Sequence, residues 1–138
     1  MACPWQLEEG MTTVLVVDDE GPIVELVRFT LEDEDLQVVE AQDGPEAVEL
    51  ARATRPDLVL LDVQLPSLSG VEVCRQLRRD PGFAGVPIVM LTAAGQASDR
   101  ERGLAAGANE YLTKPFSPLA LLALVRSLLP DKRLWPDR

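Results

Sequence analysis

The sequence is poor in several residue types, and each shortage limits what the chain can do. It contains no histidine, so any step that uses an imidazole must be carried out by another protein. Its two cysteines, Cys3 and Cys74, have neither the spacing of metal ligands nor that of a disulfide framework, which favours reduced thiols. No apolar run approaches the roughly 20 residues of a membrane span, and no signal-peptide pattern opens the chain. We therefore expect a soluble cytoplasmic protein with no membrane contact.

Positive charge is scarce as well. The chain has 13 Lys and Arg against 23 Asp and Glu, a net charge of −10, and 14 of the acidic residues fall within the first 50 positions. Because such a surface repels a phosphate backbone, we expect no direct nucleic-acid contact by this domain. Lys114 and Lys132 are the two lysines, so the position of each is informative.

Apolar runs that recur at regular intervals indicate the strands of the fold. The 138 residues are the length of one ordinary domain. Three of the runs are continuous rather than alternating, which is typical of strands buried on both faces of a parallel sheet. The expected strands are 12–17, 36–41, 57–61, 86–91 and 109–113.

Amphipathic segments of helical length separate these runs. The expected helices are 22–34, 44–54, 70–79, 97–107 and 117–129. Ser98 and Ser117 are the expected N-caps of the last two helices. Because parallel strands need crossover connections, this alternation predicts an α/β protein with a doubly wound five-stranded parallel sheet. Ligands of such sheets bind beyond the carboxyl ends of the strands.

Polar side chains follow four of the five expected strands. Asp18 and Asp19 follow the first strand, Asp62 the third, Thr92 the fourth and Lys114 the fifth. Three carboxylates gathered at one edge make an oxygen-rich site suited to Mg²⁺, which also explains why acidic residues crowd the end of a buried strand. The sequence therefore predicts a magnesium site at this edge.

The same residues fit phosphoryl transfer. A carboxylate such as Asp62 can attack phosphorus to give an acyl phosphate, while Lys114 supplies positive charge and Thr92 a hydroxyl donor to the phosphoryl oxygens. Each group alone has an ordinary structural explanation, as a turn residue, a helix cap or a surface turn. Their coincidence at one edge of one sheet favours the functional interpretation.

Four stretches carry a resemblance to a known family. "VLVVDDE", "DLVLLDVQLPSLSG", "PIVMLTA" and "GANEYLTKPFS" make the chain resemble the receiver domain of bacterial two-component response regulators over residues 12–130. Residues 1–11 would then be an N-terminal extension, and residues 131–138 a C-terminal tail or linker. The resemblance implies a flavodoxin-like sheet of order 2-1-3-4-5.

The resemblance also implies a role for each residue of the expected metal site. Asp62 would be the phosphoacceptor. Asp19 and Asp62 would bind Mg²⁺ directly, Asp18 would bind it through a water, and the backbone carbonyl of Gln64 would be a further ligand.

Three more residues receive roles from the same resemblance. Lys114 would bind the phosphoryl group, Thr92 would be the switch hydroxyl and Tyr111 the switch aromatic. The peptide bond between Lys114 and Pro115 would be cis, as an X-Pro bond permits.

The chain is accordingly expected to act as a phosphorylation-dependent signalling switch rather than as an enzyme with turnover beyond its own phosphorylation and dephosphorylation. A histidine kinase or phosphotransfer protein would donate the phosphoryl group. One alternative is a pseudo-receiver that binds proteins without phosphorylation. Another is a phosphatase with an Asp nucleophile, but such enzymes typically need an acid/base Asp where this chain has Gln64.

The last expected helix is more apolar than one buried face requires, so we expect it to form part of a homodimer or output-partner surface with the preceding helix and the strand of Tyr111. Receivers of the winged-helix transcription-factor group usually place an acid and a base where this chain has Ala120 and Leu124, which disfavours their dimer in its usual form. The spacing predicts inward positions at Leu121, Val125 and Leu128, and outward positions at Leu119, Leu122 and Ala123.

Overall fold

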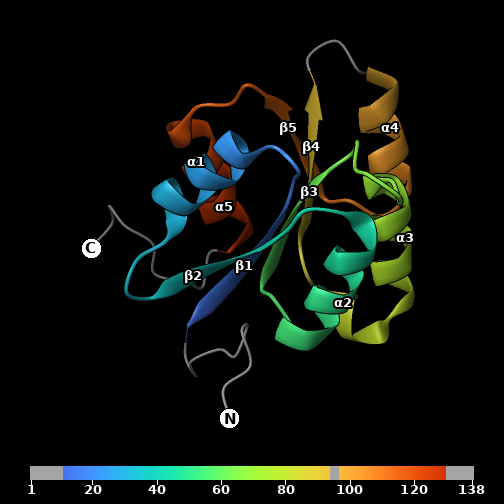
Figure 1. The fold of residues 1–138 in the computed structure, drawn as a ribbon, viewed down its shortest axis with the longest axis horizontal. Coiled ribbons are helices and arrows are strands. Elements are labelled where there is room, and N and C mark those ends of the chain that lie inside the picture. The colour runs from blue at the N-terminus through green and yellow to red at the C-terminus, as the bar shows by residue number, and fades with distance from the viewer. Residues whose placement is uncertain (1–10, 94–96, 130–138) are drawn as a thin grey trace.

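The computed structural model describes residues 11–93 and 97–129. Outside these ranges lie residues 1–10 of the expected extension, which include Cys3, and the expected tail 131–138, which includes Lys132. One parallel sheet has the order β2-β1-β3-β4-β5, which confirms the predicted topology (Figure 1). Its strands are β1 (Thr12–Val17), β2 (Leu36–Ala41), β3 (Leu58–Asp62), β4 (Ile88–Ala93) and β5 (Glu110–Lys114).

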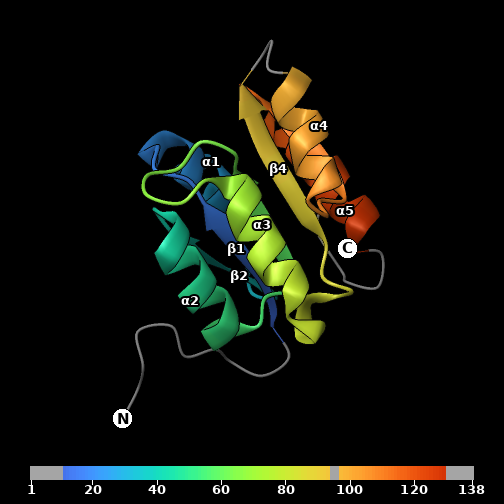
Figure 2. The same ribbon diagram turned by 90° about the vertical axis from the view of Figure 1, so that its right-hand side faces the viewer.

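Helices cover both faces of the sheet. They are α1 (Gly21–Leu31), α2 (Gly44–Thr54), α3 (Gly70–Arg79), α4 (Ala97–Ala105) and α5 (Pro118–Leu128), with a 3₁₀ turn at Pro81–Phe83. Helices α1 and α5 lie on one face, and α2, α3 and α4 on the other (Figures 1 and 2). The predicted doubly wound α/β architecture is confirmed, because crossovers run over both faces.

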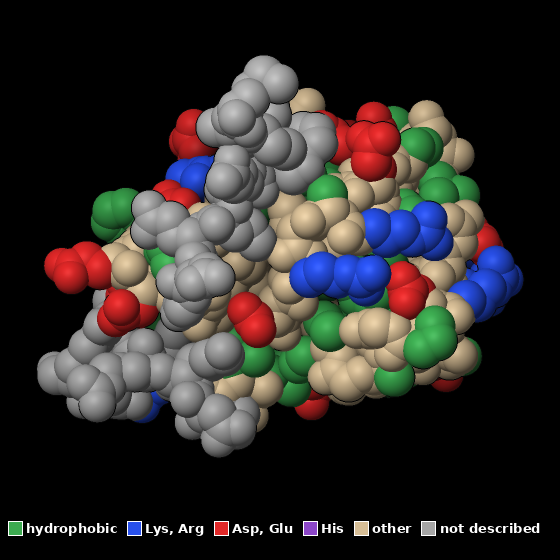
Figure 3. All heavy atoms as spheres, turned by 90° about the horizontal axis from the view of Figure 1, so that it is seen from below, with side chains coloured by type: hydrophobic (Ala, Val, Ile, Leu, Met, Phe, Trp, Pro, Cys, Tyr) green, Lys and Arg blue, Asp and Glu red, His purple; other side chains and the backbone are tan. Residues whose placement is uncertain are grey.

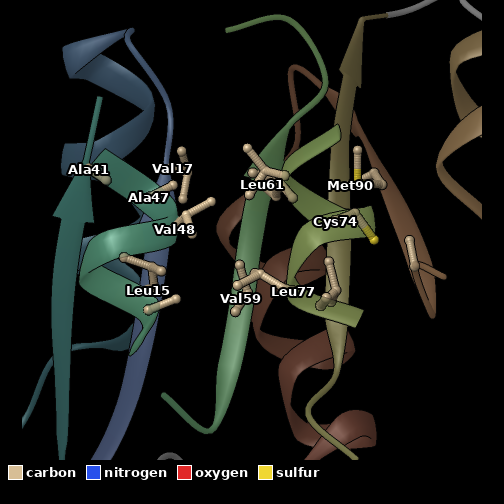
Figure 4. Close-up of a cluster of buried hydrophobic side chains, with 14 of the residues drawn as sticks. Leu15, Val17, Ala41, Ala47, Val48, Val59, Leu61, Cys74, Leu77 and Met90 are labelled. Carbon is tan, nitrogen blue, oxygen red and sulfur yellow. The ribbon is translucent and has the colours of Figure 1, made fainter. Parts of the chain in front are cut away.

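The core consists of two layers separated by the sheet. Leu15 and Val17 of β1 face α2 and α3, whereas Val14 and Val16 face α1 and α5. Figure 4 shows the first layer, in which Val17 of β1 and Leu61 of β3 are also register partners. Because successive side chains of a strand point to opposite faces, a strand buried on both sides must be apolar throughout, as the continuous runs predicted.

Several expected helix and strand bounds differ from the structure by one to three residues. Helix α1 ends at Leu31 rather than at 34, and Glu32 is already extended. The Glu32 carboxylate pairs with Arg28 at 2.9 Å and accepts a hydrogen bond from the Val38 amide at 3.1 Å, which ties the end of α1 to β2. Ser98 lies inside α4 and is therefore not its N-cap.

Ser117 is the N-cap of α5, as predicted, because its hydroxyl accepts a hydrogen bond from the Ala120 amide at 3.0 Å. The expected faces of this helix are only partly right. Leu121 and Val125 are fully buried, but Leu122 is also buried, with 8% exposure, so its predicted outward position is wrong. The reason is that α1 packs alongside α5 and covers a second side of the helix.

The end of the sheet opposite its carboxyl edge carries none of the predicted site residues. Here a cavity of about 380 Å³ is lined by residues that include Arg55, Asp57 and Phe83. The guanidinium of Arg55 lies 5.3 Å from the centre of the Phe83 ring. Figure 3 views the molecule from this side, where basic side chains (blue) lie near acidic ones (red). None of the described helices is long and apolar enough to cross a membrane.

Candidate functional site

The carboxyl ends of β1, β3 and β5 bring one lysine against three carboxylates. The Lys114 ammonium lies 2.8 Å from Asp18 Oδ2, 2.8 Å from Glu20 Oε1 and 3.2 Å from Asp62 Oδ2. Asp18 directly follows β1, while Asp62 and Lys114 are the last residues of their strands. The meeting of these side chains is a consequence of parallel strands, whose carboxyl ends share one edge of the sheet.

The carboxylates form a cluster that differs in one member from the expected metal site. One oxygen each of Asp18, Glu20 and Asp62 lies within 4.8 Å of the others. Asp19 is exposed and outside this cluster, although it lines the same cavity as Asp62. Three carboxylates and one ammonium sum to −3 + 1 = −2, a charge that a divalent cation would neutralise. The donor set therefore fits a hard cation such as Mg²⁺.

Burial and charge perturb the acidity of Asp62. Removal of the carboxyl from water, together with the nearby Asp18 carboxylate, raises the pKa of Asp62 to about 6. The Gln64 amide, which donates to Asp62 Oδ1 at 3.0 Å, and the Lys114 ammonium oppose this rise in pKa. Asp62 is thus mostly ionised at neutral pH, but in a site that disfavours its charge.

Lys114 is held as a cation. Its side chain is only 14% exposed, and burial alone would lower the pKa of its ammonium. The adjoining carboxylates of Asp18, Glu20 and Asp62 outweigh burial and raise the pKa of Lys114 above its ordinary value. The Lys114–Pro115 peptide bond is cis, as the family resemblance implied.

The start of α3 positions the backbone of Asp62. The Gly70 amide donates to the Val63 carbonyl at 2.9 Å, and the Ser69 hydroxyl accepts from the Glu72 amide at 3.2 Å. A Cβ atom on Gly70 would overlap the carbonyl oxygen of Asp62, so glycine is required for this close approach. The helix thereby fixes the strand end that carries Asp62.

The two predicted switch residues lie near the site but do not line its cavity. Thr92 is 1% exposed, and its hydroxyl has no hydrogen-bond partner among the described residues. Tyr111 is partly buried and packs against the core layer beneath α3 and α4. The guanidinium of Arg100 contacts both its ring and its hydroxyl.

An open cavity of about 310 Å³ stands above Asp62. Its walls are Asp19, Glu20, Asp62, Val63, Gln64, Leu91, Ala93 and Lys114. A carboxylate and an ammonium at the same wall offer a nucleophile and a positive charge to an incoming anion. The arrangement is therefore suited to accept a phosphoryl group.

Two members of this region were not assigned by sequence reasoning. Glu20 belongs to the carboxylate cluster, and its place in the acidic run "DDE" was the available signal. Arg100 contacts Tyr111 across 11 positions of sequence, and no local pattern indicates that pairing.

Fold and site together define a class: a doubly wound α/β domain with a carboxylate cluster and a lysine at the carboxyl edge of its sheet. Residues 14–126 match the model of the response regulator receiver domain, and the chain belongs to that family. It is thus a receiver domain, the phosphorylation-dependent switch module of two-component signalling, as the sequence predicted.

A curated relative supports this assignment. The chain is 47% identical over 123 residues to the phosphate regulon transcriptional regulatory protein PhoB of Escherichia coli (strain K12), a match that covers 89% of this chain and 53% of PhoB. The chain therefore spans about half the length of the curated relatives it matches.

Solved structures also support the assignment to the receiver domain family. A response regulator from Chloroflexus aurantiacus J-10-fl has a TM-score of 0.82 and 37% identity, covering 87% of this chain and 98% of that one. The receiver domain of the sensor histidine kinase PA1611 from Pseudomonas aeruginosa PAO1 has a TM-score of 0.79 and 32% identity, covering 87% and 98%. That structure holds a magnesium ion coordinated in its active site cleft.

Proposed function

We propose that Asp62 accepts a phosphoryl group from a histidine kinase or a phosphotransfer protein. The observation that carries this proposal is the pairing of Lys114 Nζ with Asp62 Oδ2 at the wall of an open cavity. A carboxylate oxygen of Asp62 attacks phosphorus, and the bond from phosphorus to the donor's imidazole nitrogen breaks with its electron pair. The products are an acyl phosphate and the free imidazole. Because this chain has no histidine, the donor histidine lies outside it.

Neighbouring residues then respond to the new charge. Lys114 already binds Asp62 and is placed to bind a phosphoryl oxygen attached to it. The buried Thr92 hydroxyl, which has no partner among the described residues, gains an acceptor at the same edge. Ala93 lines the cavity and leaves room for the incoming group.

For the metal, the proposed ligands are Asp19 and Asp62 directly, Asp18 through a water, and the Gln64 carbonyl. Glu20 is nearby, and its carboxylate contacts Lys114 as those of Asp18 and Asp62 do. When bound, Mg²⁺ supplies positive charge that offsets the carboxylates as an anion approaches. The charge of the cluster and the magnesium ion of the PA1611 receiver support a cation at this edge of the sheet, and the family resemblance supplies the individual ligands.

Two observations favour a phosphorylation-dependent switch over both alternatives. A phosphatase with an Asp nucleophile lacks its acid/base residue here, because Gln64 occupies that position. A pseudo-receiver would not need Asp18, Asp62 and Lys114 in mutual contact. We therefore assign the chain no turnover beyond its own phosphorylation and dephosphorylation.

The output is a separate part of the proposal. Phosphorylation would change the surface formed by α4, β5 and α5, which would contact a second copy or an output partner. Curated relatives of which this chain covers about half the length are named transcriptional regulators. The predictions that this domain does not itself contact nucleic acid and that it acts in the cytoplasm remain predictions.

Intact-mass measurement with a small phosphodonor such as acetyl phosphate tests the site. We expect the wild type to gain one phosphoryl mass only when Mg²⁺ is present, and Asp62→Asn to gain none. Equal phosphorylation of Asp62→Asn, or no effect of a chelator, would show that the assignment is wrong.

The same assay separates the two candidate metal ligands. Asp19→Asn should raise the Mg²⁺ concentration needed for half-maximal phosphorylation by about 10-fold or more, whereas Glu20→Gln should change it much less. The reverse order would identify Glu20 as the ligand.

A further inference from the structure

One arginine contacts the predicted switch aromatic at two points. The guanidinium of Arg100, on α4, lies 4.7 Å from the centre of the Tyr111 ring. Its NH1 group also donates to the Tyr111 hydroxyl at 3.2 Å. A cation over the face of a ring and a hydrogen bond to its hydroxyl both favour the same ring orientation. Rotation of Tyr111 away from α4 would break both contacts.

The approach of α4 to the sheet explains why Arg100 reaches Tyr111. A Cβ atom on Gly103 would lie 2.7 Å from Met90 Cγ, so glycine allows α4 to pack closely on β4. Met90 is the register partner of Tyr111 on the neighbouring strand. Arg100 precedes Gly103 by three positions and shares its face of α4, which places the guanidinium over the ring.

Thr92 connects this contact to the phosphoacceptor. It follows Met90 by two positions on β4, so its side chain lies on the same face of the sheet as those of Met90 and Tyr111. Movement of the buried Thr92 hydroxyl toward a phosphoryl group on Asp62 changes the packing on this face. Tyr111 can follow only if its contacts with Arg100 open.

We propose that Arg100 is a positioning residue that holds Tyr111 against α4 in the unphosphorylated protein and thereby opposes phosphorylation of Asp62. This inference rests on the proposed function, in which Asp62 is the phosphoacceptor and Tyr111 the switch aromatic. A contact present in one conformation only shifts the equilibrium by its own free energy. Loss of the contact therefore shifts the equilibrium toward the phosphorylated conformation by the same factor.

The sequence provides a clean probe, because Tyr111 is its single tyrosine. Incorporated 3-fluorotyrosine gives one ¹⁹F NMR signal that reports on this ring. Without donor, Arg100→Ala should move the signal from the wild-type position toward the position of the phosphorylated wild type. The initial rate of Asp62 phosphorylation by acetyl phosphate with Mg²⁺ should rise about 5-fold, the factor for losing one weak cation–π contact and one hydrogen bond.

Two further variants keep the result interpretable. Arg100→Lys keeps the charge but loses the planar fork, so its signal and rate should lie between those of the wild type and Arg100→Ala. Glu101→Ala removes an exposed charged side chain of the same helix, and both measurements should match the wild type.

The outcomes separate this inference from the function on which it rests. If phosphorylation moves the wild-type signal but Arg100→Ala has the wild-type signal and rate, Arg100 does not hold Tyr111 and the proposed function stands. If mass measurement shows Asp62 phosphorylated while the wild-type signal is unmoved, Tyr111 is not the switch aromatic and the inference is wrong. Failure of Asp62 to take up phosphate overturns the proposed function itself.

Discussion

At the scale of single residues, opposing electrostatic effects set the acidity of Asp62. Asp62 is buried beside Asp18, and the Lys114 ammonium and the Gln64 amide offset only part of the cost of its charge. The result is a carboxylate whose pKa is raised to about 6. A group with a raised folded-state pKa favours folding when protonated, and this contribution is lost as pH rises through that pKa.

Neutralising Asp62 should therefore stabilise the protein when no metal is bound. The rise in pKa from the ordinary value of 3.8 limits the possible gain in the free energy of unfolding to about 3 kcal/mol. In a chelator at pH 8, we expect Asp62→Asn to raise the free energy of unfolding by about 1–3 kcal/mol. The difference from the wild type should shrink as pH falls from about 6 toward 4, because the wild-type carboxyl becomes protonated in the folded state.

Urea denaturation at several pH values measures this effect. Glu49→Gln is the matched control, because Glu49 is an exposed carboxylate on α2, and its stability should follow the wild type at each pH. Mg²⁺ should also reduce the difference in free energy of unfolding between Asp62→Asn and the wild type, since metal binding stabilises the wild type. A less stable Asp62→Asn at pH 8 would contradict the assigned electrostatics.

At the scale of secondary-structure elements, the first residue of α3 determines how closely the helix approaches the site. Gly70 has no room for a Cβ atom beside the Asp62 and Val63 backbone. Gly21, the first residue of α1, has no neighbouring atom within 4 Å of where its Cβ would lie. The two glycines occupy equivalent helix positions in different surroundings, which makes them a matched pair.

Gly70→Ala should push α3 away from the end of β3. We expect a loss of stability of about 1–3 kcal/mol, as for other overpacked sites, together with slower phosphorylation of Asp62. Gly21→Ala should be neutral or slightly stabilising, because alanine lowers the entropy of the unfolded chain. Thermal unfolding and the mass assay measure both effects, and equal stability of the two variants would show that the contact at Gly70 is not restrictive.

At the scale of the whole molecule, exposed apolar side chains lie on both helices that flank β5. Leu104 of α4 is 43% exposed and Leu119 of α5 is 78% exposed, while Leu122 is withdrawn into the core. Phe29 is also exposed, but it lies on α1. Leu119 is therefore the large apolar side chain that α5 exposes to a partner.

We expect the activated wild type to self-associate through this face. Sedimentation velocity with and without beryllofluoride, which mimics the phosphoryl group, should show a larger species only in its presence. Leu119→Glu should remain monomeric, and Phe29→Glu should behave as the wild type. A monomeric wild type under both conditions would eliminate the homodimer and leave an output partner for this surface.

The residues of the sequence by themselves determined the doubly wound parallel class, the burial of strands on both faces and the edge of the sheet where the polar residues meet. Continuous apolar runs such as 12–17 can only be buried on both faces, and crossovers place the strand ends together. The pairing of Lys114 with Asp62 follows from that geometry. The family resemblance then supplied the strand order and the individual roles, which position and composition alone would have left open.

Only the tertiary structure decided which groups are in contact. It buried Leu122, because α1 packs beside α5, and it placed Glu20 rather than Asp19 in the carboxylate cluster. It also set Arg100 over Tyr111. These outcomes depend on how closely two elements approach and on which side chain can reach across the gap, quantities that periodicity along one chain does not contain.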